Sequence, residues 1–437
     1  MLKDYFCSSP WFHLRINPAG YYIPCRWDFV STTSKYNVAN TTLLEYMNSD
    51  VMRDLRMNLL DGQRLDMCKS CHFEDQNKKV NGRQRQLLKS GISLNNFDKT
   101  LCASPHFDLF EHSYNNQGHS DKVPIDLQID LGNTCNSACV MCYPIYSSRL
   151  ATDYVRLNKI DPDIFKLMTM ERNWTDNEAV VDRFIEELKQ IPDIKYLHFL
   201  GGETLYLKSF YDICNRLIDA GLSKNISFGT TTNCTVWNDN IEPILASFDH
   251  VHLGMSIEAL HPINDYVRWP SKIDQVLGNV DKFLKLREKT NLHLSLRITP
   301  NALTLLHIDT IFEFMIENSI IAESCNILRD PLCLRMEVLP KEIMQIVVDK
   351  VDRVIKKYNL SDDPVKVVNR RRPDLIDPII AEIIFEYQRF FKNCMSMEDD
   401  SERYNLVKFL KGFEQLRGNR ILDYLPEYEE FLRSYGY

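Results

Sequence analysis

Three cysteines in one short loop have the types and the spacing to do chemistry: Cys135, Cys139 and Cys142. They stand in the run Cys-Asn-Ser-Ala-Cys-Val-Met-Cys, so three thiolates fall within eight residues. Such a loop can fold around one face of a [4Fe–4S] cubane, which leaves the fourth iron open to another ligand. Zinc is the simpler alternative, but structural zinc sites usually complete four protein ligands. The loop therefore predicts an iron–sulfur cluster with one iron that the loop does not ligate.

A second group of cysteines lies in the first 90 residues. Cys7 and Cys25 flank Gly20, and Cys68 and Cys71 form a C-x2-C pair. Gly20 permits a hairpin that brings Cys7 and Cys25 together. Four such ligands bind either a second cluster or zinc. The remaining cysteines stand alone, as buried small side chains often do: Cys102, Cys214, Cys234, Cys325, Cys333 and Cys394.

These loops need a scaffold, and from Pro124 onward the sequence alternates between strand and helix patterns. Six strands with intervening helices indicate an α/β fold, a parallel sheet curved into a full or partial barrel. In such folds the chemistry gathers at the carboxyl ends of the strands. The expected strands are Ile125–Leu131, Tyr196–Leu200, Asn225–Val236, His250–Ile257, Asn291–Ile298 and Asn326–Leu339. The expected helices between them include Leu207–Ala220, Ile273–Leu286 and Leu303–Asn318.

The pattern divides the chain into four parts. Residues 1–91 carry the first cysteines around a helix expected over Thr41–Leu60, and residues 92–123 form a polar linker. Residues 124–340 form the partial (β/α)6 barrel, and residues 341–437 form a helical extension. Its helices are expected at Lys341–Tyr358, Leu375–Phe391 and in shorter pieces between Asn405 and Tyr435. The run Arg370-Arg371-Arg372 could bind phosphate or RNA, but its place between helices favours a solvated turn.

The C-x3-C-x2-C spacing of the loop, just after the first expected strand, is typical of the radical S-adenosylmethionine (SAM) superfamily. Gly201, Gly202 and Glu203 end the second strand and match the GGE motif of that superfamily. The chain therefore resembles radical SAM enzymes. The resemblance implies that the open iron chelates the amino and carboxylate groups of SAM. It also implies that the Glu203 carboxylate pairs with the SAM ammonium group.

Weaker motifs of the superfamily follow in order at the ends of later strands. In relatives these positions contact the methionine, ribose or adenine part of SAM, although each could also be ordinary capping of a strand end. Cys234 stands where the family often has glycine, and a buried thiol is the favoured reading. No catalytic residue is assigned beyond the cluster ligands. The resemblance implies these SAM contacts: Met141, Gly201, Gly202, Glu203, Asn233, Ser256, Glu258, Arg268, Ile298 and Asn301.

The amino-terminal cysteines resemble the twitch module of radical SAM enzymes, a shortened SPASM domain. The resemblance implies that Cys7, Cys25, Cys68 and Cys71 enclose an auxiliary [4Fe–4S] cluster, so that the cofactors are two such clusters and SAM. Twitch modules normally follow the barrel, whereas this one precedes it. It must fold back to reach the mouth of the barrel.

The resemblance also implies a mechanism. One electron from a flavodoxin or ferredoxin reaches the SAM cluster, SAM is cleaved, and a 5′-deoxyadenosyl radical removes hydrogen from the substrate. The auxiliary cluster favours net oxidation of a peptide or protein. The alternative is a radical dehydrogenase or rearrangement enzyme acting on a small sugar, alcohol or nucleoside. A non-catalytic iron–sulfur or zinc protein is the rival from another class, and the GGE motif disfavours it.

Composition sets further bounds. The 437 residues carry a net charge of −8, which disfavours broad nucleic-acid binding. No apolar run is long enough for a membrane span, and the start of the chain does not resemble a signal peptide. Thirteen cysteines without a secretory signal favour a reducing compartment. We therefore expect a cytoplasmic protein that binds neither membranes nor nucleic acids.

Overall fold

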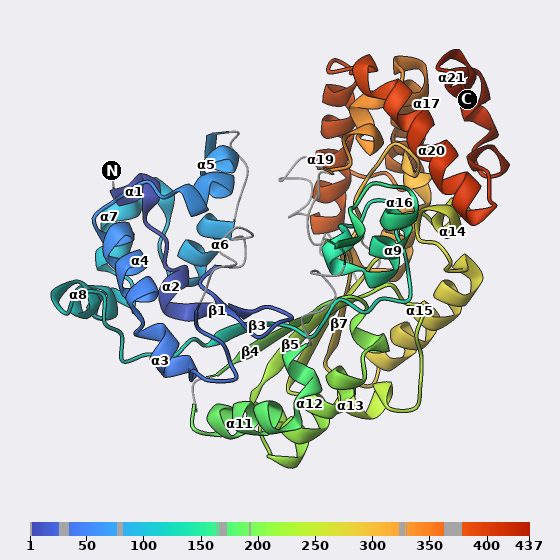
Figure 1. The fold of residues 1–437 in the computed structure, drawn as a ribbon. Coiled ribbons are helices and arrows are strands. Elements are labelled where there is room, and N and C mark those ends of the chain that lie inside the picture. Colours follow the sequence, from blue (N-terminus) through green and yellow to red (C-terminus); the bar gives the residue numbers. More distant parts are fainter. Residues whose placement is uncertain are drawn as a thin grey trace.

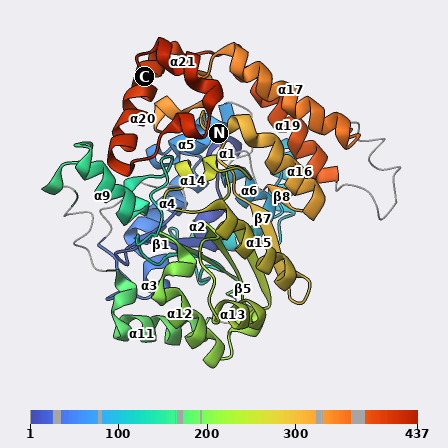
Figure 2. The same cartoon turned by 90° about the vertical axis from the view of Figure 1, so that its right-hand side faces the viewer.

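The computed structural model describes residues 2–25, 35–76, 82–163, 165, 173–191, 194–322, 328, 330–361 and 378–437. Within these residues a sheet of eight strands lies at the centre of the molecule. The helices from the two ends of the chain rise on opposite flanks of this sheet (Figure 1). Green and yellow helices from the middle of the chain cover the side of the sheet away from them (Figures 1 and 2).

The sheet confirms the predicted α/β architecture. Its strand order is β2-β1-β3-β4-β5-β6-β7-β8, and every neighbouring pair except β1 and β2 runs parallel. From β3 to β8 the strands follow one another in chain order, which is the arrangement of a six-stranded partial barrel. The strands are β1 (His13–Ile16), β2 (Tyr22–Ile23), β3 (Asp126–Asp130), β4 (Tyr196–Leu200), β5 (Ser227–Thr232), β6 (His250–Met255), β7 (Leu292–Leu296) and β8 (Ile321–Ala322).

The two faces of the sheet differ in chemistry because side chains alternate along each strand. One face is apolar and packs against helices; Phe199 and Phe228, for example, contact Phe210 of α12 (Lys208–Asp219). The other face carries polar side chains across neighbouring strands. The register aligns Gln128 with His198, His198 with Gly229, Gly229 with His252, and His252 with His293.

Helices account for most of the remaining described residues. The amino-terminal helices are α1 (Leu2–Tyr5), α2 (Ser9–Phe12), α3 (Leu43–Met47), α4 (Asp50–Leu60), α5 (Lys69–Gln76), α6 (Gly82–Lys89), α7 (Phe97–Cys102) and α8 (Phe107–Asn115). The other helices of the barrel are α9 (Ser148–Arg156), α11 (Glu178–Lys189), α13 (Ile241–Ser247), α14 (Ile263–Val267), α15 (Ile273–Arg287) and α16 (Ile308–Asn318). The carboxyl-terminal helices are α17 (Lys341–Lys357), α19 (Pro378–Cys394), α20 (Arg403–Arg417) and α21 (Glu429–Ser434).

The amino-terminal part is joined to the barrel through the sheet itself. β1 pairs with β3, and the buried Arg15 guanidinium lies 2.5 Å from the Asp130 carboxylate of β3. The linker expected over residues 92–123 is wrong in structure, because this stretch forms α7 and α8. Phe97 and Phe110 of these helices pack in a separate small core with Phe6 and Trp11. Apolar side chains hidden in a polar stretch therefore make it part of the folded amino-terminal domain.

Two expected elements also differ. The helix expected over Thr41–Leu60 is two helices, α3 and α4, because Ser49 caps the second by accepting a hydrogen bond from the Met52 N–H. The last strand, expected over Asn326–Leu339, is instead β8 at Ile321–Ala322. Between Pro331 and Pro340 the chain forms two short 3-10 turns, Leu332–Leu334 and Met336–Val338. Flanking prolines at 331 and 340 oppose a central strand here. Arg370, Arg371, Arg372 and Cys325 lie outside the described residues.

Candidate functional site

The three-cysteine loop begins directly after β3, as the sequence predicts. Burial, and then the neighbouring Cys139, raises the pKa of Cys135 and of Cys142 to about 12. Burial also raises the pKa of Cys139. Buried thiols that crowd one another resist ionisation, and a cationic metal centre stabilises several thiolates at one place. The donor set of this loop therefore fits an iron–sulfur cluster.

Neighbouring segments hold the backbone of this loop through hydrogen bonds. Several of its carbonyl groups accept from outside the loop, among them Thr134 from the Glu203 N–H, Asn136 from Arg149, Ser137 from the Ser147 hydroxyl, and Ala138 from Arg417. The N–H groups of Ala138 and Val140 donate to the carbonyls of Trp269 and Val267, at 2.7 and 2.9 Å. A loop without regular secondary structure thus has its backbone polar groups satisfied, which fixes where its thiols lie.

The two glycines of the GGE motif allow β4 to approach this loop closely. Both have a positive φ, +116° at Gly201 and +42° at Gly202. A Cβ atom on Gly201 would lie 2.3 Å from the Gly132 carbonyl oxygen, and one on Gly202 would lie 1.9 Å from the Thr134 carbonyl oxygen. No side chain fits at either position, so both residues must be glycine for the motif to sit against the cysteine loop.

Glu203 points its carboxylate into a buried network at the ends of β4 and β5. Its oxygens accept hydrogen bonds from the Asn233 N–H at 2.6 Å, the Thr232 hydroxyl at 2.7 Å and the Leu205 N–H at 3.2 Å. Burial raises the pKa of Glu203, and the hydrogen bonds from Asn233 and Thr232 oppose that rise. A buried carboxylate held by three donors is oriented to pair with a cationic group.

A second carboxylate, that of Glu258, is linked to the loop through Arg268. Glu258 is buried, and it accepts from Arg268 at 2.5 Å and from the Thr299 N–H at 2.7 Å. The other end of the Arg268 guanidinium lies 3.6 Å from the Cys139 sulfur. Burial alone would lower the pKa of Arg268, but Cys139 and Glu258 raise it above the ordinary value. Arg268 therefore places a positive charge beside Cys139, one of the predicted cluster ligands.

Asn233 ties the end of β5 to the cysteine loop. Its side-chain amide donates to Asn136 at 2.8 Å and to the Ser137 hydroxyl at 3.0 Å. Its side-chain oxygen, Oδ1, accepts from the N–H and hydroxyl of Thr235. The structure thus brings Glu203, Asn233, Glu258 and Arg268 of the sequence prediction to the three-cysteine loop.

The other predicted SAM contacts take different places. Met141 is buried inside the loop, and Ser256 follows β6, where its N–H donates to the Thr232 carbonyl. Ile298 is buried beyond the end of β7. Asn301 is fully buried and uses its side chain within its own turn, donating to the Thr299 carbonyl and accepting from the Leu303 N–H. Asn301 therefore acts at least as a local cap.

Cys234 is buried, as expected, and its backbone explains the glycine that the family often has there. Its φ is +59°, a left-handed conformation that non-glycine residues seldom adopt. Asn279 donates to its carbonyl at 2.9 Å and holds that conformation. Burial raises the pKa of the Cys234 thiol well above its ordinary value, so the residue is an inert packing group rather than a nucleophile.

The four amino-terminal cysteines form a second group. Burial raises the pKa of Cys7, and the thiols of Cys25, Cys68 and Cys71 raise it further, so all three lie within electrostatic reach of Cys7. Gly20, at φ +89°, makes the turn between Cys7 and Cys25. Cys102 is exposed on α7. This donor set suits an auxiliary iron–sulfur cluster, and it also suits zinc.

The sequence places Thr232 beside Asn233 at a strand end, and in the structure its hydroxyl donates to Glu203. Sequence reasoning missed two other residues that shape the site. Trp269 supplies a carbonyl to the cysteine loop. Arg417 reaches the loop from the carboxyl-terminal extension, 279 residues along the chain from Ala138. No signal in the sequence connects Arg417 with the loop.

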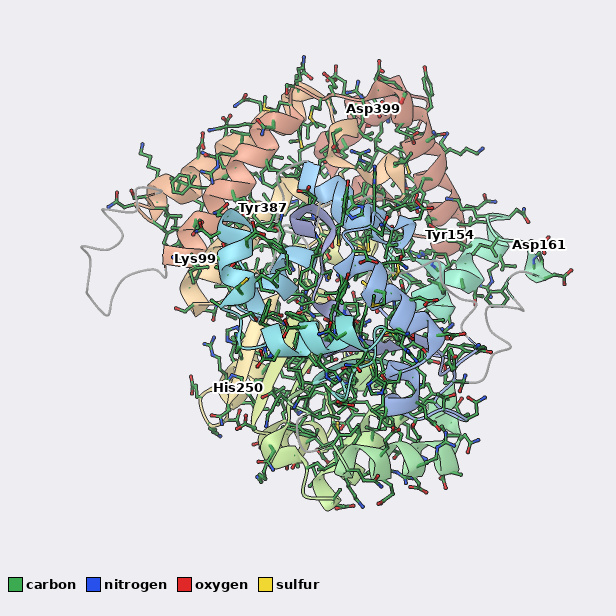
Figure 3. The ribbon with its side chains drawn as sticks, turned by 90° about the vertical axis from the view of Figure 1, so that its left-hand side faces the viewer. Lys99, Tyr154, Asp161, His250, Tyr387 and Asp399 are labelled. Atoms are coloured by element: carbon green, nitrogen blue, oxygen red, sulfur yellow. The ribbon has the colours of Figure 1, made fainter. Side chains whose placement is uncertain are left out.

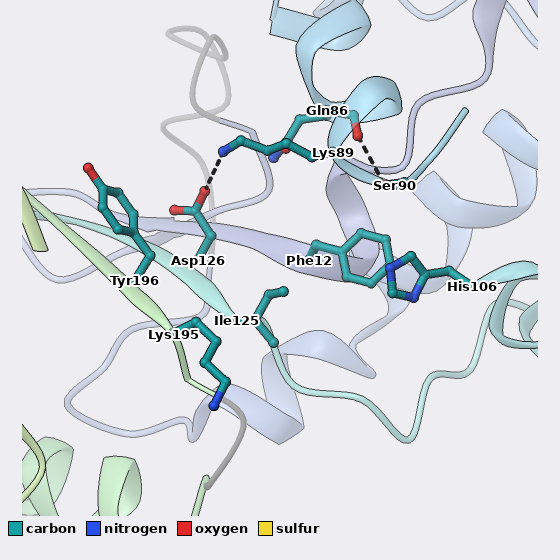
Figure 4. Close-up of a pocket in the computed structure, with 9 residues that line it drawn as sticks. All are labelled: Phe12, Gln86, Lys89, Ser90, His106, Ile125, Asp126, Lys195 and Tyr196. Carbon is teal, nitrogen blue, oxygen red and sulfur yellow. Dashed lines mark hydrogen bonds and ion pairs between the residues drawn. The ribbon is translucent and has the colours of Figure 1, made fainter. Parts of the chain in front are cut away.

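A cavity of about 220 Å³ lies elsewhere, between the amino-terminal helices and the starts of β3 and β4 (Figure 4). Phe12, Lys89, His106, Asp126 and Tyr196 are among the residues that line it, and Lys89 lies 3.6 Å from the Asp126 carboxylate. Asp126 begins β3, whereas the cysteine loop follows the end of that strand. The cavity is therefore separate from the cysteine site.

Family comparisons agree with this geometry. The model of the radical SAM superfamily matches residues 129–302, which contain the three-cysteine loop and the ends of β4 to β7. The model of an iron–sulfur cluster-binding domain, SPASM, matches residues 7–72, which contain the four amino-terminal cysteines. The comparison with curated proteins found no match. Among the described residues no helix is long and apolar enough to cross a membrane.

The chain is also similar to solved structures at low identity. One is native anSMEcpe with bound AdoMet, at 14% identity and a TM-score of 0.36; the similarity covers 54% of this chain and 60% of that one. Another is SuiB of Streptococcus suis bound to S-adenosylmethionine, at 14% identity and a TM-score of 0.38, covering 80% of this chain and 70% of that one. SuiB bound to the precursor peptide SuiA gives 15% identity, a TM-score of 0.37, and coverage of 81% and 70%.

Proposed function

We propose that this chain, a radical SAM enzyme with an amino-terminal iron–sulfur cluster-binding domain, holds two [4Fe–4S] clusters and oxidises a peptide or protein substrate. The observation that carries the proposal is the meeting of Glu203, Asn233 and Arg268 at the three-cysteine loop. A protein that merely carried electrons would not need a buried carboxylate held at the end of the second barrel strand.

In this proposal Cys135, Cys139 and Cys142 hold the SAM-binding cluster, and Cys7, Cys25, Cys68 and Cys71 hold the auxiliary one. When bound, these groups supply reductive cleavage of SAM, hydrogen abstraction from the substrate, and acceptance of the electron that a net oxidation releases. The residues that we assign as contacts to SAM are Met141, Gly201, Gly202, Glu203, Asn233, Ser256, Glu258, Arg268, Ile298 and Asn301.

In this proposal, side chains of the protein position SAM and offset the negative charge of the cysteine thiolates. Glu203 accepts a hydrogen bond from the ammonium group of SAM, because its carboxylate is buried and already oriented by the Asn233 N–H and the Thr232 hydroxyl. Arg268 offsets the negative charge of the thiolates, because its guanidinium lies 3.6 Å from the Cys139 sulfur. Glu258 orients Arg268 and is itself held by the Thr299 N–H. The short distances and the burial keep water from competing with these contacts.

The polar face of the sheet supports a substrate that has many polar groups. Tyr196, His198, His252 and Arg297 lie on this face and are half-buried, whereas the alternate residues of their strands are fully buried. Gly229 leaves room for the Tyr196 side chain and Gly254 for Arg297, because these side chains lie over the two glycines. A peptide offers backbone and side-chain partners to such a surface. A small sugar, alcohol or nucleoside is the second candidate.

The electron donor and the compartment belong to the same proposal. Reduction of the SAM-binding cluster calls for a low-potential one-electron donor of the flavodoxin or ferredoxin type. Seven cysteine ligands need a reducing compartment to stay available for iron, so we assign the enzyme to the cytoplasm.

Substrate class is tested anaerobically with the reconstituted enzyme, SAM and a strong reductant. Candidate peptides and a panel of small alcohols, sugars and nucleosides are incubated separately and analysed by mass spectrometry. We expect a peptide to lose two mass units, as loss of two hydrogens requires, with 5′-deoxyadenosine formed in step. Turnover of a small molecule while all peptides stay unchanged would reject the peptide assignment and retain the radical SAM activity.

A further inference from the structure

The carboxyl-terminal extension reaches the three-cysteine loop through one side chain. Arg417 is the last residue of α20, and its side chain is only 2% exposed. One of its terminal nitrogens donates to the Ala138 carbonyl at 2.7 Å. Ala138 is fully buried and immediately precedes Cys139. A residue outside the matched radical SAM segment therefore contacts the backbone between two predicted cluster ligands.

The position of the Arg417 guanidinium is fixed on several sides. Asp153 of α9 accepts from two of its nitrogens, at 2.9 and 3.3 Å, and the Asp153 carboxylate is also buried. The guanidinium carbon lies 4.3 Å from the ring centre of Phe413 and 5.1 Å from that of Trp269. A planar guanidinium between aromatic rings and a carboxylate loses little freedom when it donates to Ala138.

The same frame holds the other side of the Ala138 peptide. The Ala138 N–H donates to the Trp269 carbonyl at 2.7 Å, and the Trp269 ring packs against Arg417. Arg149 also lies over Trp269, at 4.7 Å, and donates to the Asn136 carbonyl. Two arginines and one tryptophan thus hold the loop segment that leads from Cys135 to Cys139.

The contact between α9 and α20 extends beyond this arginine. The Tyr154 ring lies 6.2 Å from Phe413, on the side of the molecule where α9 meets the carboxyl-terminal helices (Figure 3). The ammonium group of Lys159 lies 4.2 Å from the ring centre of Phe409. The extension is therefore packed against the helix that follows the cysteine loop.

We infer that Arg417 is a positioning residue for the SAM-binding cluster, and that the carboxyl-terminal extension completes this site by packing against the three-cysteine loop. The inference goes beyond the proposed function, which assigns no role to the extension, and it rests on the placement of a cluster at Cys135, Cys139 and Cys142.

The first test uses metal-free protein, so that it does not depend on the cluster. Hydrogen exchange is measured in peptides that cover residues 134–142 and, for comparison, β5. In Arg417→Met we expect the loop to exchange roughly ten to a hundred times faster, as loss of a charge-assisted hydrogen bond predicts, with β5 unchanged. Arg433→Met, an exposed arginine on α21, is the matched control and should exchange like the parent chain. Loop exchange within twofold of the parent in Arg417→Met overturns the inference.

The second test uses the reconstituted enzyme. The change that SAM causes in the electron paramagnetic resonance spectrum of the reduced protein reports on the SAM-binding cluster alone. The SAM concentration that produces half of this spectral change measures the affinity for SAM. We expect that affinity to be at least tenfold weaker in Arg417→Met and partly recovered in Arg417→Lys. Auxiliary-cluster iron should not be lost in either variant. An unchanged SAM response overturns the inference, whereas a parent chain without any cluster at this loop rejects the proposed function instead. If Arg417→Met fails to fold, Asp153→Asn removes the partner charge of Arg417 and must show the same loop-specific effect.

Discussion

Replacement of Glu203 by glutamine is the sharpest test of the SAM-binding assignment. The change keeps the size of the side chain and removes its charge. In the parent chain one carboxylate oxygen accepts from Thr232 and Leu205, and the other accepts from the Asn233 N–H at 2.6 Å. The glutamine oxygen can replace only one of these two acceptors. Its NH2 group then faces a backbone N–H, that of Asn233 or that of Leu205, and this N–H finds no acceptor.

Two losses set the expected magnitude. The proposed charge-assisted hydrogen bond between Glu203 and the SAM ammonium would be worth about 1.5–3 kcal/mol, so its loss should weaken SAM binding by roughly 10- to 100-fold. The unmet backbone donor, Asn233 or Leu205, costs about 1–3 kcal/mol in the free energy of folding. Because the cluster ligands lie on another loop, iron content should stay at the parent value.

Anaerobic calorimetry of SAM binding to the reconstituted protein measures the first loss. Glu242→Gln, an exposed residue of α13, serves as the control and should bind SAM like the parent. Burial raises the pKa of Glu203 above the ordinary 4.5, so in the parent SAM affinity should fall as pH drops through that raised value. The glutamine variant should lack this dependence. SAM affinity within threefold of the parent, at full iron content, would refute the role of Glu203.

Three further changes probe other parts of the structure. Cys68→Ala should lose about four irons per chain yet retain SAM cleavage in iron assays and product analysis; an unchanged iron content rejects Cys68 as a ligand. Gly202→Ala places a Cβ atom 1.9 Å from the Thr134 carbonyl oxygen, so it should lower the free energy of unfolding by more than about 2 kcal/mol in urea titration. Parent-like stability there contradicts the close approach. Asp130→Ala breaks the buried ion pair of Asp130 with Arg15 and should lower the free energy of unfolding by about 3–5 kcal/mol in the same titration. A decrease under about 1 kcal/mol would show that this pair does not stabilise the junction between the amino-terminal part and the barrel.

The sequence predicted those parts of the site that lie close together along the chain. The three-cysteine spacing and the GGE motif could be read directly, because a strand end and the loop after it are local features. The strands from β3 to β7 were predicted because buried parallel strands are short apolar runs between turn signals. The residues of the Glu203 network follow from the same rule, since each stands at a strand end.

The remaining features depend on contacts between distant segments. The pairing of β1 with β3 joins residues more than 100 positions apart, and its signal is no more than two apolar residues, Leu14 and Ile16. Residues 92–123 resemble a linker in sequence because apolar residues such as Phe97 and Phe110 are few in a polar stretch. These two side chains are buried by packing with Phe6 and Trp11, which are distant in the sequence. The contact of Arg417 with Ala138 has no local pattern at all.

The central claim is a two-cluster radical SAM enzyme, and anaerobic reconstitution tests it most directly. Iron and sulfide are counted per chain, and 5′-deoxyadenosine is measured after addition of SAM and a strong reductant. Four irons per cubane predict about eight irons per chain, together with reductive cleavage of SAM. About four irons with cleavage would remove the auxiliary cluster, and an iron-loaded protein that forms no 5′-deoxyadenosine would contradict the account.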